Sequence, residues 1–316
     1  MVHIENIFVT HTKVGNFVTI KENMTFKTEN QKDKILITGS TGNVGFEVVK
    51  SALKIGLHIV VGIREEKDAL KFSGLDVETR IIDFEKPETF PLAIDGISRI
   101  FLLRPPALSN VKKYIFPFLA LAKDTGIKQI VLLSLLGADK NLITPHRKIE
   151  KEIMSLHIPY TFLRPSFFMQ NLSTTHRAEI KNEQAICLPA GKGKTSFVDI
   201  RDIAEVAALS FTGNQFLNQS YSLTGGEALN YYEVADIFSK VLGTKIVYRN
   251  LSLISFYYRL KHQGFPFGQR IIMSAIYLTA KLGLAGRVTT DVDNLLKRKP
   301  TSMEQFVRDN KNIWIS

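Results

Sequence analysis

Three glycines spaced as GxxGxxG are the residues of this sequence that point most directly to a ligand. Gly39, Gly42 and Gly45 lie in KILITGSTGNVGFEVVKSAL, after an apolar run and at the opening of an amphipathic helical pattern. The first glycine permits a tight turn, the second lets the backbone approach a diphosphate, and the third lets the helix pack close to a strand. Exposed N–H groups at the helix start would hold the anion. We therefore expect a dinucleotide site formed by Gly39, Ser40, Thr41, Gly42, Asn43, Val44 and Gly45, the alternative being a strand-to-helix turn that merely needs glycine.

The residues after the next apolar run, HIVVGI, indicate which dinucleotide is bound. A protein that prefers NAD(H) places an acid there for the ribose hydroxyls, whereas here Arg64 stands at that position with Lys67 close behind. A guanidinium forms paired, charge-assisted hydrogen bonds with a 2′-phosphate, so we expect NADP(H) to be preferred. Glu65 and Glu66 follow at once and keep NAD(H) open, and Arg64 has a second interpretation as an ordinary surface charge.

The residue that would donate a proton is less obvious than the cofactor loop. Short-chain dehydrogenases use Tyr-x-x-x-Lys on the helix after the fifth strand, where the lysine lowers the pKa of the tyrosine. Here that helix, PHRKIEKEIMSLHIPY, has no tyrosine before Tyr160, and the YxxxK patterns that start at Tyr257 and Tyr277 come too late in the chain to reach the cofactor. His146, at the start of this helix, can donate a proton or a hydrogen bond near neutral pH unless it merely faces solvent. Glu150, one turn on, either orients the imidazole or pairs with a nearby cation.

An aromatic segment, RPSFFMQNL, provides candidates for substrate binding. Phe167, Phe168 and Met169 would form an apolar floor on which a flat acceptor stacks, and Asn171 would be a polar anchor. Core packing is the alternative for each apolar member, and it is favoured for Met169.

Short β-branched runs alternate with helical patterns from Lys34 onward, and the runs are apolar on both faces. This pattern predicts an α/β fold of the Rossmann type, a doubly wound parallel sheet covered by helices on both sides. We assign residues 34–164 and about 195–224 to this domain. Residues about 165–194 and 225–316 are assigned to a smaller, mostly helical C-terminal substrate lobe. The expected helices cover roughly 109–125, 146–157, 231–242 and the stretch FFMQNLSTTHRAEI.

Composition narrows the class of protein. The 316 residues contain one cysteine, Cys187, so no disulfide forms within the chain, and a reducing, cytoplasmic location is expected. The apolar stretch IIMSAIYLTAKLGLAG is interrupted by Lys281 and is shorter than the roughly 20 residues of a membrane-spanning helix. No histidine or cysteine shows the spacing of a metal site. Residues 1–33 are an extension before the first strand, in which a hairpin at Gly15-Asn16, a poorly ordered segment and a leader ahead of Met24 all remain open.

Charge is concentrated near the C-terminus. The chain carries a formal charge of +11, and residues 251–316 hold ten Lys/Arg against four Asp/Glu, a net charge of +6. Nucleic-acid binding is not favoured, because no nucleic-acid-binding motif accompanies this excess. A solvated basic face, or attraction for anionic ligands, is the simpler explanation.

Several motifs taken together resemble the NmrA-like branch of atypical short-chain dehydrogenases. They are GSTGNVG, GIR, DFEKPE, RIFLLRPP, QIVLLS, IPYTFLRPSFFMQNL, SFVDIRDIAEVAA and YSLTGGEALNYYEVADI, and they span roughly residues 34–250. The resemblance implies a Rossmann domain that binds NADP(H) and a smaller C-terminal lobe. It also implies cofactor contacts beyond the glycine loop and Arg64, namely from Asp83, Phe84, Leu103, Arg104, Pro105 and Ser134. The resemblance further implies that His146 takes the position where several related reductases and sensors carry a lysine, which makes it the candidate catalytic residue.

Two functions of different classes follow. The first is an NADPH-dependent reductase that transfers hydride to a small electrophilic acceptor of aromatic or quinone-like structure, a reaction with little need for a dedicated acid. The alternative is a redox sensor that binds NADP(H) and acts through a regulatory protein partner, since the family includes such sensors. A sugar epimerase is disfavoured because that chemistry needs the missing tyrosine. Whether the chain is a monomer or a homodimer stays open, as does the identity of the acceptor.

Overall fold

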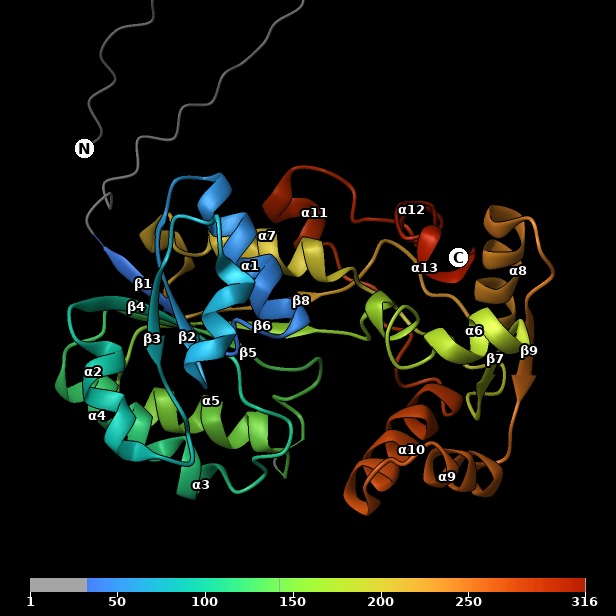
Figure 1. The fold of residues 1–316 in the computed structure, drawn as a ribbon, viewed down its shortest axis with the longest axis horizontal. Helices are drawn as coiled ribbons and strands as arrows, with labels where there is room; N and C mark the ends of the chain where they lie inside the picture. Colours follow the sequence, from blue (N-terminus) through green and yellow to red (C-terminus); the bar gives the residue numbers. More distant parts are fainter. Residues whose placement is uncertain (1–32, 142, 316) are drawn as a thin grey trace, which may run out of the picture.

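A seven-stranded sheet forms the centre of the computed structural model, which describes residues 33–141 and 143–315 (Figure 1). Its strand order is β3-β2-β1-β4-β5-β6-β8, and every neighbouring pair is parallel. The strands are β1 (Lys34–Ile37), β2 (His58–Ile63), β3 (Glu78–Ile81), β4 (Ile97–Leu102), β5 (Gln129–Leu133), β6 (Tyr160–Pro165) and β8 (Gln219–Leu223). This is the predicted Rossmann topology, in which ligands bind outside the carboxyl ends of the strands where the order reverses, here between β1 and β4.

Both faces of the sheet are buried, as the apolar strands predict. In β1, Ile35 and Ile37 belong to the core on one face and Leu36 to the core on the other, and all three side chains are buried. The helices on the first face are α1 (Asn43–Lys54), α7 (Ile200–Leu209) and α11 (Asp291–Leu296). Those on the second are α2 (Phe90–Ile94), α3 (Val111–Tyr114), α4 (Phe116–Asp124) and α5 (Pro145–Ser155).

A second lobe with its own hydrophobic core lies beside the carboxyl ends of the strands (Figure 1). It contains a two-stranded parallel sheet, β7 (Ala185–Leu188) with β9 (Val247–Asn250). Its helices are α6 (Arg177–Glu183), α8 (Tyr231–Leu242), α9 (Leu253–His262), α10 (Phe267–Lys281), α12 (Met303–Asp309) and α13 (Asn312–Ile315).

Helix α8 has the bounds predicted from the sequence, and its local signals explain why. The side chain of Asn230 accepts hydrogen bonds from the N–H groups of Tyr232 and Glu233, and the Glu233 carboxylate accepts one in return from the Asn230 N–H. Gly243 ends the helix in the left-handed conformation, with φ of 73°. These capping interactions lie within a few residues of the helix ends, so a sequence pattern suffices to predict them.

Three expectations were wrong in detail. The helix expected over 109–125 is two helices, α3 and α4, which are separated at Ile115 just before Pro117. The stretch expected to be one helix from Phe167 forms a single 3₁₀ turn at Met169–Asn171 and then α6. Helix α11, assigned to the substrate lobe, packs against α7 and buries Val292 in the core of the Rossmann domain.

Residues 1–32 lie outside the described residues, and with them the predicted N-terminal extension apart from Asp33. None of the helices within residues 33–141 and 143–315 has the length and apolar character needed to span a membrane.

Candidate active site

The glycine loop between β1 and α1 brings the start of the helix close to the end of the strand. Gly39 has a φ of 62°, a conformation that favours glycine. A Cβ atom on Gly45 would lie 2.2 Å from the Gly39 carbonyl oxygen, whereas one on Gly42 would lie 3.3 Å from the same atom. Gly45 is therefore the position at which only a hydrogen fits. This close approach leaves the N–H groups at the start of α1 pointing out of the loop, as an anion site requires.

Hydrogen bonds from buried hydroxyl groups fix the loop to its neighbours. Ser40 is fully buried and its Oγ donates to the Gly62 carbonyl at the end of β2, over 2.7 Å. The Thr38 Oγ1 accepts from the Leu103 N–H, over 2.9 Å, and so joins β1 to the end of β4. Ser40 thus acts through its side chain on the scaffold, and its contribution to a ligand would come from the backbone.

Arg64 lies at the end of β2 with 62% of its side chain exposed. Its Nη2 donates to Glu85 over 2.7 Å, and its Nε lies 3.5 Å from Asp83 Oδ2. The guanidinium is therefore held in place but remains open to a ligand on its other edge. Glu65, the acid that would favour NAD(H), caps the 3₁₀ helix Glu66–Phe72 and pairs with Lys67 over 2.6 Å.

A second cation at this end of the site has no counterpart among the residues predicted from the sequence. Lys71 donates a hydrogen bond from Nζ to the Thr41 carbonyl oxygen, and its ammonium group lies 5.0 Å from the centre of the Phe46 ring. Lys71 and Thr41 are 30 positions apart. No local pattern indicates that they meet, because the contact arises only when β2 pairs with β1.

Asp83 and Phe84, which the family resemblance implies near the adenine, have side chains in different surroundings. Asp83 is buried, and its Oδ1 accepts from the Glu85 N–H over 3.0 Å while its Oδ2 faces Arg64. The ring of Phe84 points into the core, where it packs edge-on against Phe118 at 5.4 Å between ring centroids. A contact between Phe84 and an adenine would thus have to come from its backbone.

The two residues that follow β4 make different contacts. Leu103 approaches the glycine loop, since its Cδ2 would lie 3.0 Å from a Cβ on Gly39. The Nη1 of Arg104 donates to the carbonyl oxygens of Pro105 (2.8 Å), Pro106 (3.1 Å) and Leu108 (3.2 Å). The guanidinium is half-buried, and burial lowers its pKa. Pro105 therefore contributes its carbonyl group to Arg104.

Ser134, at the end of β5, belongs to a buried charged network. Its Oγ donates to Glu150 Oε1 over 2.7 Å, and the same carboxylate receives two hydrogen bonds from Arg164, each of 2.9 Å. Arg147 adds a third cationic contact at 3.1 Å. Glu150 is completely buried, so these partners compensate its desolvation. Of the two roles considered for Glu150, the structure shows ion pairing.

His146 stands at the first turn of α5 and is half-buried. Burial, reinforced by the positive charge of Arg104, lowers the pKa of His146 to about 4, against an opposing effect of Glu150. The imidazole is consequently neutral at pH 7. A neutral imidazole can donate or accept a hydrogen bond but is a poor source of a proton, which favours the hydrogen-bonding role over the acidic one.

The aromatic segment crosses from one lobe to the other, and its two phenylalanines separate. Phe168 packs against the core of the Rossmann domain, whereas Phe167 packs against the core of the second lobe, with its ring 6.5 Å from that of Tyr277. They do not form one continuous floor together with Met169, which is 2% exposed. Asn171 is half-buried, and within the described chain its side-chain amide has no hydrogen-bond partner.

Comparison with known proteins agrees with this geometry. The model of the NmrA-like family matches residues 31–307. The chain belongs to the NmrA-like family. Among curated proteins it is similar to an NAD(P)H azoreductase of Xenophilus azovorans, at 28% identity over 87% of this chain and 96% of the relative.

Solved structures of the same fold are also similar to this NmrA-like chain. A Citrobacter triphenylmethane reductase complexed with NADP(H) has a TM-score of 0.79 at 26% identity, over 87% of this chain and 99% of the other. An NADPH-dependent quinone oxidoreductase of Escherichia coli complexed with NADPH has a TM-score of 0.80 at 25% identity, over 88% and 100%.

The tyrosines of this NmrA-like chain do not rebuild the usual short-chain dehydrogenase pair. Tyr257 lies on α9 and Tyr277 on α10, both in the second lobe. Tyr277 is buried, and its hydroxyl lies 2.5 Å from His176 Nε2, while burial raises its pKa. Helix α5 itself carries no tyrosine. Both late YxxxK patterns therefore lie on helices of the second lobe and not on α5.

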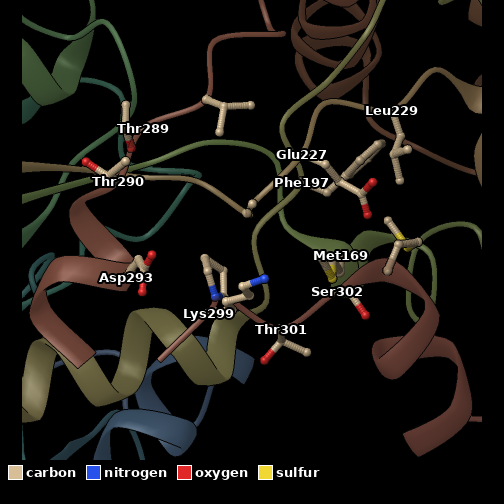
Figure 2. A pocket seen from close by; sticks show the side chains of 15 residues that line it. Met169, Phe197, Glu227, Leu229, Thr289, Thr290, Asp293, Lys299, Thr301 and Ser302 are labelled. Atoms are coloured by element: carbon tan, nitrogen blue, oxygen red, sulfur yellow. The ribbon is translucent and has the colours of Figure 1, made fainter. Parts of the chain in front are cut away.

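A cavity of about 380 Å³ lies between the lobes at the end of β8 (Figure 2). In Figure 2, Lys299 lies between Asp293 of α11 on one side and Glu227 on the other. Met169 is the one predicted substrate-segment residue in its lining, and no residue of the glycine loop takes part. A second cavity, of about 320 Å³, lies beside the start of α1 and is lined partly by Asn43 and Lys71. Within the described residues, no group of His, Cys, Asp and Glu side chains is arranged to hold a metal ion.

Proposed function

We propose that this protein is an NADPH-dependent reductase of a small, flat, electrophilic acceptor of aromatic or quinone-like structure. The observation that carries the proposal is the glycine loop, where Gly45 packs against the Gly39 carbonyl so closely that the start of α1 is free to receive a diphosphate. The named relatives that reduce azo compounds, triphenylmethane dyes and quinones support the reaction class.

The residues present fit NADP(H). Arg64 offers an exposed guanidinium at the end of β2. Lys71 places its ammonium group against the glycine loop, at the Thr41 carbonyl oxygen. Two cations near the adenosine ribose match the double negative charge of a 2′-phosphate. The acid Glu65 is held by its own helix cap and by Lys67, so it is not placed to bind ribose hydroxyls. The arrangement therefore supports a preference for NADPH over NADH.

The acceptor half of the site lies at the ends of β4, β5 and β6. Bound NADPH supplies a hydride, and a proton from solvent completes the reduction of a quinone to a hydroquinone. The chain's own groups would orient the acceptor: Arg104 and His146 from one side, and Asn171 from the segment that joins the lobes. No tyrosine on α5 stands ready to protonate an alkoxide, which argues against alcohol dehydrogenation.

The test follows NADPH absorbance with purified protein and a panel of quinones, azo dyes and triphenylmethane dyes, with NADH in parallel. We expect turnover with at least one class and a higher kcat/KM with NADPH. Tight NADPH binding without turnover of any acceptor would contradict the proposal and favour the redox sensor. A pull-down with the NADP⁺-bound and NADPH-bound protein would then search for the regulatory partner.

A further inference from the structure

Helix α10, at the edge of the second lobe, has an apolar face that the described chain leaves open to solvent (Figure 1). Six large side chains on this helix and just beyond its end are between 43% and 71% exposed, and we call them the α10 patch: Phe267, Ile271, Ile272, Ile276, Leu282 and Leu284. The opposite side of the helix buries Tyr277 and Ala280 in the core of the lobe. A helix that is apolar on both sides is normally covered on both.

Exposed apolar surface is concentrated around this helix. Of the fifteen large hydrophobic side chains that are exposed in the described chain, nine lie within residues 251–290. Single exposed apolar residues are ordinary on a protein surface, whereas a contiguous group of them marks a place where something binds. The α10 patch therefore indicates a binding surface outside the candidate active site.

A group of cations, here called the basic cluster, lies at the C-terminal end of the α10 patch. Lys281 ends α10 and Arg287 follows it, and both side chains are exposed. The Gly/Lys loop of residues 189–194 joins them, because a Cβ on Gly193 would lie 1.8 Å from a backbone oxygen in the last turn of α10. This contact brings Lys192 and Lys194 to the same end of the helix.

The charge of this surface is not balanced by the chain itself. Residues 251–290 contain five Lys/Arg and no Asp or Glu. Within the described residues, Arg259 pairs with acids of α6 and Lys194 with Glu233, whereas Lys192, Lys281 and Arg287 form no ion pair. A partner that fits both features must offer apolar groups to the patch and negative charge to the cluster.

A second copy of this chain does not meet that requirement. In a symmetric contact both subunits present the same surface, and residues 251–290 would bring only further cations to it. An anionic lipid surface meets it fully. A 15-residue helix such as α10 lies in the plane of the membrane interface, with its apolar side chains among the acyl chains and nearby cations at the level of the phosphates.

We propose that the α10 patch and the basic cluster dock this protein on the surface of an anionic phospholipid membrane, without crossing it. The α10 patch supplies the burial of apolar area, and the basic cluster makes the attachment selective for anionic headgroups and sensitive to salt. This role does not depend on the proposed reductase activity.

The test measures co-sedimentation of the full chain with vesicles of phosphatidylcholine alone and of equimolar phosphatidylcholine and phosphatidylglycerol. We expect binding to the mixed vesicles only, and release by added sodium chloride. Replacing Ile272 and Ile276 together by glutamine should weaken the partition coefficient about tenfold, because both apolar side chains leave the acyl region. The matched control replaces Leu70 and Leu92 of the Rossmann domain, each 79% exposed, and should bind as wild type does.

A second pair of variants tests the basic cluster. Lys281→Gln with Arg287→Gln should weaken binding to the mixed vesicles about tenfold. The control, Lys112→Gln with Lys123→Gln, removes the same charge from exposed positions of α3 and α4 and should change binding little. Equal losses in the two pairs would overturn the proposal, because they would assign binding to the net charge of +11. Thermal unfolding shows that each variant is folded.

Four other outcomes also overturn the membrane surface. The first is that wild type binds neither kind of vesicle, or both equally. The second is that the Ile272 and Ile276 variant keeps vesicle binding but converts a wild-type dimer to a monomer in sedimentation velocity, which would make the patch an interface between copies. The third is that this variant keeps vesicle binding but loses turnover of an acceptor, which would make the patch a wall of the acceptor site. The fourth is that soluble polyglutamate, and not the vesicles, binds in a way that depends on Ile272 and Ile276, which would indicate an acidic protein.

Discussion

Replacing Gly45 by alanine tests the idea that the glycine loop is shaped for a diphosphate. The new Cβ would lie 2.2 Å from the Gly39 carbonyl oxygen, 2.7 Å from its carbon and 2.8 Å from the Ser40 Cα. All three are backbone atoms, so no side chain can rotate away. Because non-bonded heavy atoms settle roughly 3.5 Å apart, the start of α1 must move from the loop by about 1 Å.

A displacement of that size has two measurable consequences. Overpacking of this kind costs about 2 kcal/mol, which for a chain of this size lowers the Tm by roughly 3 °C. The N–H groups at the start of α1 leave the diphosphate by the same distance, and we expect the Kd for NADPH to rise by about tenfold to a hundredfold. Fluorescence titration with NADPH and thermal unfolding measure the two effects separately.

Two other glycines provide matched controls. Gly42→Ala brings its Cβ to 3.3 Å from the Gly39 oxygen, a tight contact that a few tenths of an ångström relieve, so its effect should be intermediate. Gly268→Ala meets nothing within 4 Å on helix α10 and should stabilise the protein by up to about 1 kcal/mol without changing NADPH affinity. A folded Gly45→Ala protein that binds NADPH as wild type does would refute the close-packed loop as the cofactor site.

Three further predictions concern charge and proton transfer. Arg64→Gln should raise KM for NADPH about tenfold and leave KM for NADH almost unchanged, with Lys86→Gln as an exposed control; equal effects on both cofactors would remove Arg64 from 2′-phosphate recognition. His146 has a folded-state pKa of about 4, below the value of 6.5 of an exposed histidine. As the pH falls, the imidazole is therefore protonated at a higher pH in the unfolded chain than in the folded one. The free energy of unfolding therefore keeps its full value above pH 6.5 and falls by roughly 3 kcal/mol as the pH drops towards 4, relative to a His146→Gln protein. Urea unfolding of both proteins across this range measures the difference, and parallel pH profiles would contradict the prediction. Tyr277→Phe should leave kcat within about twofold while lowering stability by about 1 kcal/mol, because the Nε2 of the buried His176 loses its partner while Nδ1 keeps Glu179; a large fall in kcat would give this tyrosine a catalytic role.

Local patterns in the sequence were enough to predict the scaffold. The apolar runs that became β1, β2, β4, β5 and β6 are buried on both faces, and a chain that alternates such runs with helices can bury them in few ways other than a covered parallel sheet. Helix α8 has its predicted bounds, since Asn230 and Gly243 lie within one turn of its ends. The family motifs are equally local, and the match over residues 31–307 confirms them.

Contacts between distant residues account for what the sequence did not reveal. Lys71, which follows β2, donates a hydrogen bond to Thr41, which follows β1. Glu150 on α5 accepts hydrogen bonds from Ser134 at the end of β5 and from Arg164 on β6. Phe167 and Phe168 are neighbours in sequence but pack in different cores, because extended backbone turns successive side chains to opposite sides. The two phenylalanines have the same hydropathy, so the sequence does not show which core each side chain joins.

The residue types and their spacing by themselves predicted a dinucleotide-binding α/β protein, and they predicted a cation at the position that would meet the extra phosphate of NADP(H). Residue spacing carries that information, because turns, caps and strands form from groups that are close along the chain. The state of each functional group depended on the tertiary structure. The low pKa of His146 and the commitment of Glu150 to its arginines follow from desolvation and from partners on other elements. Those quantities exist only once the chain has folded around them.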